Sequence, residues 1–95
     1  MIKAFTCRPA RELPLSVIGW LIDVAGSENE GPGIVVDAVL ALINAWNNGN
    51  ENAFLLYDDI IEAAKEAKKN HPMPLVTEPA ERLIAFIQKG FAGQV

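Results

Sequence analysis

The fold class follows most directly from residues 51–69, which read ENAFLLYDDIIEAAKEAKK. Apolar side chains recur there at the three- and four-residue spacing of an α-helix with one buried face. Acidic residues occupy its first two-thirds and lysines its last turns, an order that favours a helix through its dipole. Asn50 directly precedes the stretch, and its side-chain oxygen can accept a hydrogen bond from a free N–H of the first turn. We therefore expect an amphipathic helix over residues 51–69.

Two further helices are expected on the N-terminal side, over residues 34–47 and 14–25. Pro14 suits a first helical turn because its missing N–H would have no partner there. Gly26 suits the end of the same helix because glycine takes a positive φ without a Cβ clash. Residues 34–36 favour extended backbone, so we expect a frayed start to the other helix.

A fourth helix is expected over residues 78–89, with Thr77 as its cap and Gly90 as its stop. Residues 1–7 are a candidate short strand, which would pair with residues 75–77. An isolated pair of strands is only marginally stable, so helices dominate the expected structure. The sequence therefore predicts an all-α fold, a compact bundle of about four helices with this N-terminal strand as its one candidate exception.

A single helical domain over residues 1–95 accounts for the whole length. The apolar fraction of 51% is high for a chain of this size and argues against disorder. Cys7 is the only cysteine, which excludes an internal disulfide and a cysteine-rich zinc site. The longest apolar stretch, residues 13–25, is too short to cross a bilayer, and no secretory signal is recognisable. We expect a cytoplasmic protein that uses no cofactor and contacts no membrane.

The two N-terminal helices are apolar nearly all round, which is unusual for a bundle of four. Polar interruptions fall on a single line of each helix, with Ser16, Gly19 and Asp23 on one and Asp37 and Asn44 on the other. A helix of this kind is either central in the core or covered by another chain, so we expect a homodimer or an obligate partner. In the alternative, one helix is central and the N-terminal segment covers the other. The apolar side chains concerned are Val17, Ile18, Trp20, Leu21, Ile22, Val24, Val35, Val36, Val39, Leu40, Leu42 and Ile43.

Charge is distributed unevenly around a net charge of −4. No lysine or arginine occurs between Glu12 and Ala64, whereas most of the acidic residues lie in that span. A field of one sign repels nucleic acid and attracts a basic partner, although a solvated acidic surface has the same pattern.

The densest acidic cluster is formed by Asp58, Asp59 and Glu62. Asp58 and Glu62 are four residues apart and share a helix face, so their oxygens could hold a divalent cation. The same residues also fit a solvated polar face on the acidic part of the helix, and we favour this interpretation, together with charge-based partner recognition, over a metal site.

Large aromatic residues offer a second set of candidate contacts. Trp20 and Trp46 could anchor an interface, since tryptophan is common at energetically dominant contact sites. Packing between the first two helices is the competing and preferred interpretation of both side chains. His71 and Cys7 have no recognisable catalytic partners in the sequence.

The sequence favours a small acidic, non-catalytic protein-binding module, such as a regulator, inhibitor or immunity-like protein that acts by direct contact. Its expected contacts are Asp58, Asp59, Glu62, Trp20 and Trp46, and its expected partner is another protein with a basic surface. One alternative is a metal-binding or small enzyme domain that uses the acidic helix. Another is a helical DNA-binding regulator, which the charge distribution disfavours.

Overall fold

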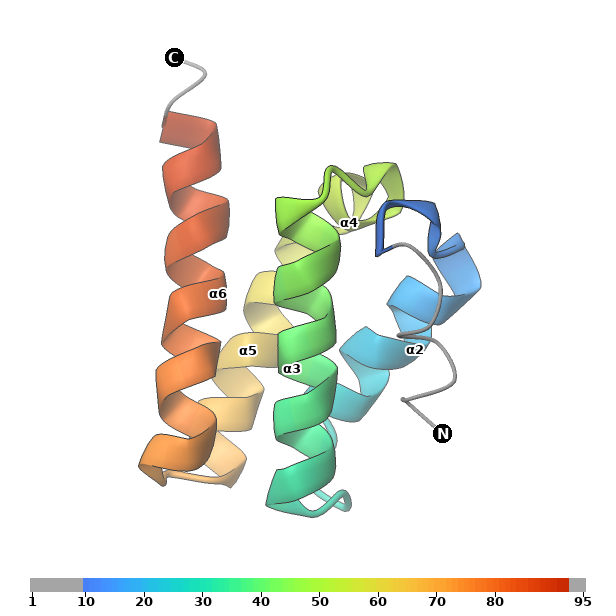
Figure 1. Cartoon of the computed structure of the whole chain (residues 1–95). Helices are drawn as coiled ribbons and strands as arrows, with labels where there is room; N and C mark the ends of the chain where they lie inside the picture. Colours follow the sequence, from blue (N-terminus) through green and yellow to red (C-terminus); the bar gives the residue numbers. More distant parts are fainter. Residues whose placement is uncertain (1–9, 93–95) are drawn as a thin grey trace.

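The computed structural model describes residues 10–92 and shows the all-α fold predicted from the sequence (Figure 1). No strand occurs among these residues. A single 3₁₀ turn precedes five α-helices, four of which are long. The elements are η1 (Ala10–Glu12), α2 (Leu15–Ala25), α3 (Pro32–Asn47), α4 (Glu51–Leu55), α5 (Tyr57–Asn70) and α6 (Pro74–Ala92).

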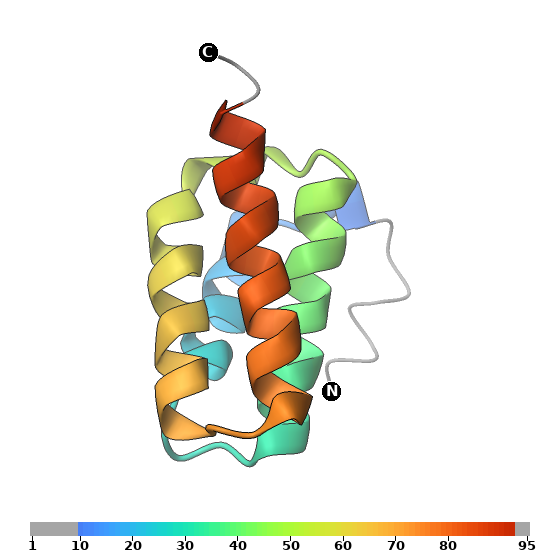
Figure 2. The same ribbon diagram turned by 90° about the vertical axis from the view of Figure 1, so that its left-hand side faces the viewer.

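The four long helices form a closed ring in which each packs mainly on two neighbours. Helix α2 packs on α3, α3 on α6, α6 on α5, and α5 returns to α2. Figure 2 shows α5, α6 and α3 across the near side of the bundle, with α2 behind them. Short helix α4 bridges the end of α3 and the start of α5 (Figure 1). The core lies inside this ring, and its largest fully buried apolar side chains are Ile18, Leu21, Leu42, Ile60, Leu83 and Ile87.

Most of the apolar surface of the two N-terminal helices is covered within the monomer, but several large side chains remain exposed, including Leu15, at 47%, and Ile34, at 46%. Among the apolar residues named for them above, only Trp20, at 38%, and Leu40, at 44%, are exposed. Ser16 and Asp23 on α2, and Asp37 and Asn44 on α3, are exposed as well. Each helix therefore turns its polar line outward, while the ring of helices buries most of its remaining apolar side chains.

The helix expected over residues 51–69 is divided at Leu56, whose φ of −102° and ψ of 26° interrupt the helical backbone. The expected cap at Asn50 is confirmed, because its side chain accepts hydrogen bonds from the N–H groups of Asn52 and Ala53. Short α4 contacts α2 and α3, whereas α5 packs mainly on α6. Tertiary packing on different neighbours thus overrides a continuous helical pattern.

The N-terminal helices differ from expectation in the details of their ends. Helix α3 begins at Pro32 instead of Ile34 and has no frayed start, because proline is pre-organised for the first helical position. Pro14 is the residue before α2 and not its first residue. Gly26 ends α2 with a φ of −89°, so no positive φ is needed there.

Helix α6 begins at Pro74, four residues before the expected start, and contains Pro79. Residues 75–77 are therefore helical and cannot be the expected partner strand. Val76 is fully buried, and its N–H and that of Thr77 both donate to the Met73 carbonyl. Burial of Val76 favours this early start. The candidate strand at residues 1–7 lies outside the described residues, and Gly90 does not end the helix.

None of the helices described between residues 10 and 92 is both long and apolar enough to cross a membrane.

Candidate functional site: an acidic groove between α2 and α5

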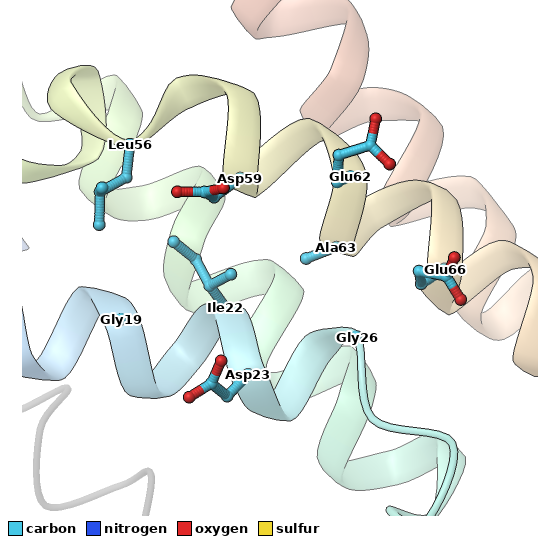
Figure 3. Close-up of a pocket in the computed structure, with 9 residues that line it drawn as sticks. All are labelled: Gly19, Ile22, Asp23, Gly26, Leu56, Asp59, Glu62, Ala63 and Glu66. Atoms are coloured by element: carbon cyan, nitrogen blue, oxygen red, sulfur yellow. The ribbon is translucent and has the colours of Figure 1, made fainter.

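An open groove of about 540 Å³ separates α2 from α5 (Figure 3). The two helices are close together where α2 ends, since a methyl group at Gly26 would lie 3.6 Å from the Ala63 Cα atom. The Asn70 side-chain amide also donates a long hydrogen bond of 3.5 Å to the Gly26 carbonyl. At the other end, a methyl group at Gly19 would have no neighbour within 4 Å. The groove is thus narrow near Gly26 and open near Gly19.

Apolar side chains form the floor of the groove and carboxylates form its walls. Ile22, Leu56 and Ala63 lie at the bottom, where Ile22 points from α2 towards α5 (Figure 3). Asp23 stands on the α2 side, and the α5 wall carries Asp59, Glu62 and Glu66. These three α5 positions follow the i, i+3 and i+7 spacing, which places them on one helix face.

The groove has a single sign of charge. No lysine or arginine lines it, and its four carboxylates make no ion pair with any residue from 11 to 89. All four are exposed to solvent. Lys68, two residues after Glu66, pairs instead with Glu81 of α6. The Lys68 Nζ and Glu81 Oε1 atoms are 3.2 Å apart. The groove therefore presents a negative potential above an apolar surface.

The structure separates the three acidic residues that the sequence grouped. Asp59 and Glu62 line the groove, whereas Asp58 is exposed outside it. Asp23 and Glu66 were not selected from the sequence. Glu66 could have been found by its four-residue spacing from Glu62, and Asp23 by its place on the polar line of its helix. That residues of α2 and α5 line one groove could not be predicted without knowing that these helices pack side by side.

Neither tryptophan lines the groove. Trp46 lies near the end of α3, where its ring meets Phe54 of α4 edge-on, with centroids 4.7 Å apart and an interplanar angle of 80°. This contact joins α3 to α4, and Trp46 is also partly buried against the core, so its packing between the first two helices stays a prediction. Trp20 is on the outer side of α2.

The described residues contain no group of three His, Cys, Asp or Glu side chains that could hold a metal ion. His71 follows α5, and its Nε2 atom is buried with no hydrogen-bond partner in the part of the chain that the structure describes. Cys7 lies outside the described residues. The groove brings together four carboxylates, one from α2 and three from α5.

Comparisons of the chain with protein-family models, curated proteins and solved structures gave no match, so its function is argued from its own geometry.

Proposed function

We propose that the protein is a non-catalytic binding module that recognises a basic protein partner through the groove between α2 and α5. The observation that carries this proposal is the combination of four carboxylates with an apolar floor in one open groove. Carboxylates attract lysine and arginine side chains, and the floor gives an apolar surface that a partner can cover. The module would act as a regulator or inhibitor by direct contact.

A nucleic acid is not the partner proposed, because the phosphate backbone carries the same sign of charge as the groove. A basic protein surface gains from that charge in two ways. The negative field speeds the encounter between the partners, and contacts at the groove then slow their separation. Both effects weaken as added salt screens the charges.

Quantitative affinity capture from the native source, followed by mass spectrometry, tests the proposal. The wild-type protein is compared with the double variant Asp59→Asn, Glu62→Gln, which removes two charges from the groove. The matched control is Glu30→Gln, Asp37→Asn, which removes two charges from residues that do not line it. We expect the groove variant to lose a basic protein that wild type and control both retain. Equal capture by all three proteins would contradict the proposal.

The homodimer expected from the sequence stays a prediction, since most apolar side chains of α2 and α3 are buried within the monomer but Leu15, Trp20, Ile34 and Leu40 are exposed. Light scattering coupled to size exclusion tests it. A 10.3 kDa monomer at micromolar concentration would contradict the dimer and leave the proposed function intact.

A further inference from the structure

The geometry points to a socket for one apolar side chain at the Gly19 end of the groove, and we infer that the partner contributes a cationic amphipathic segment that fills it. This inference rests on the proposed function and specifies the chemistry of the partner. The segment carries one aliphatic or aromatic anchor, followed by lysine or arginine side chains along the acidic walls.

The proposed socket lies where Gly19, which has no side chain, lines the open end of the groove. No heavy atom lies within 4 Å of the position that its Cβ would occupy. Ile22 and Leu56 border this space and are both only partly buried. An incoming apolar side chain would therefore cover two apolar side chains that the monomer leaves partly in water.

The carboxylates determine what surrounds the anchor. Asp23 and Asp59 belong to opposite walls, so cationic groups on either side of the partner segment can each meet one of them (Figure 3). Glu62 and Glu66 continue the α5 wall towards the narrow end, with the separation of about 6 Å that is typical of i, i+4 positions. The narrow end has no room for a second bulky anchor, because Gly26 and Ala63 approach closely there. A fitting segment therefore places its apolar anchor at the Gly19 end of the groove and its cationic side chains towards the Gly26 end.

Synthetic peptides and two protein variants test the socket. The probe peptide is a lysine-rich amphipathic helix with one leucine anchor, and its matched control has alanine in place of that leucine. Spermine serves as a cation without an anchor. Gly19→Leu fills the socket from within. The control variant, Gly33→Leu, makes the same change at an exposed position of α3, where a Cβ also has no neighbour within 4 Å but which does not line the groove.

Titration calorimetry gives the affinities, and amide chemical shifts locate the binding. We expect the wild-type protein and Gly33→Leu to bind the leucine peptide at least about tenfold more tightly than the alanine peptide. Gly19→Leu should lose this preference. The shifts should concentrate at Gly19, Ile22 and Gly26 and along the α5 wall.

Three outcomes would overturn the inference: no binding of the leucine peptide at low salt, equal affinity for both peptides and spermine, or an unchanged preference in Gly19→Leu. None of them would by itself contradict the proposed function, which depends on whether Asp59→Asn, Glu62→Gln loses a native partner. Circular dichroism confirms that each variant is folded, and a glycine replaced inside a helix should not weaken it.

Discussion

The Asn50 side-chain amide donates a hydrogen bond of 3.1 Å to the main-chain carbonyl of Leu13, which lies 37 positions earlier in the chain. Asn50 is completely buried, and its Oδ1 atom accepts from the N–H groups of Asn52 and Ala53 at 2.9 and 3.0 Å. One side chain therefore caps α4 and also fixes the segment that leads into α2. This hydrogen bond holds the start of α4 next to the residues that precede α2.

Replacement of that side chain should be costly. We predict that Asn50→Ala lowers the free energy of unfolding by about 1–3 kcal/mol, since it removes a helix cap and a buried hydrogen bond. Urea denaturation followed by circular dichroism measures the change. The control is Asn48→Ala, whose exposed side chain donates to the Asn44 main-chain and side-chain oxygens, and its effect should stay within about 0.5 kcal/mol. A loss at Asn50 no larger than at Asn48 would contradict the role assigned to this link.

The same residue shows what the sequence could and could not predict. The cap at Asn50 is a local feature, so the sequence identified it correctly. The break at Leu56 was not predicted, because no glycine or proline marks it and the packing of α4 and α5 on different neighbours causes it. On α5 the sequence selected Asp59 and Glu62, but helical spacing paired Glu62 with Asp58, which does not line the groove, and Glu66 was not selected. The opposing Asp23 and the space at Gly19 depend on how α2 packs on α5, and no local pattern encodes that arrangement.

Gly19 should limit the stability of α2. We predict that Gly19→Ala raises the free energy of unfolding by about 0.5–1 kcal/mol, because glycine inside a helix costs backbone entropy and the added methyl meets no neighbour within 4 Å. Thermal denaturation provides the comparison. Gly49→Ala should instead destabilise by about 1–2 kcal/mol, since Gly49 has a φ of 79°. A destabilised Gly19→Ala variant would show that the space at this position is occupied.

Repulsion within the acidic wall should also be measurable. Glu62 has three acidic neighbours at helical spacing, Asp58, Asp59 and Glu66, against one lysine, Lys65. We therefore predict that Glu62→Gln stabilises the protein by a few tenths of a kcal/mol, on the order of one like-charge pair. Urea denaturation at low and high salt tests this, because salt should reduce the difference. Asp58→Asn is expected to have the opposite sign, since Asp58 lies in the first turn of α5 and favours the helix dipole. A loss of stability in Glu62→Gln at low salt would refute the repulsion.

Asp58 and Asp59 allow the effect of a lost charge to be separated from the effect of its position relative to the groove. They are adjacent, both exposed, and both lie in the first turn of α5, but only Asp59 lines the groove. Each contributes one charge within a Debye length of about 10 Å of the groove, so Asp58→Asn and Asp59→Asn should slow association with a basic partner to a similar degree at low salt.

Dissociation should differ, because it depends on direct contacts that only Asp59 can make. We predict that Asp59→Asn raises the dissociation rate of the leucine peptide by about two- to fivefold, the range for an exposed ion pair, while Asp58→Asn leaves it nearly unchanged. Surface plasmon resonance with the immobilised protein measures both rates. Equal increases in the dissociation rate for the two variants would mean that the partner does not occupy the groove.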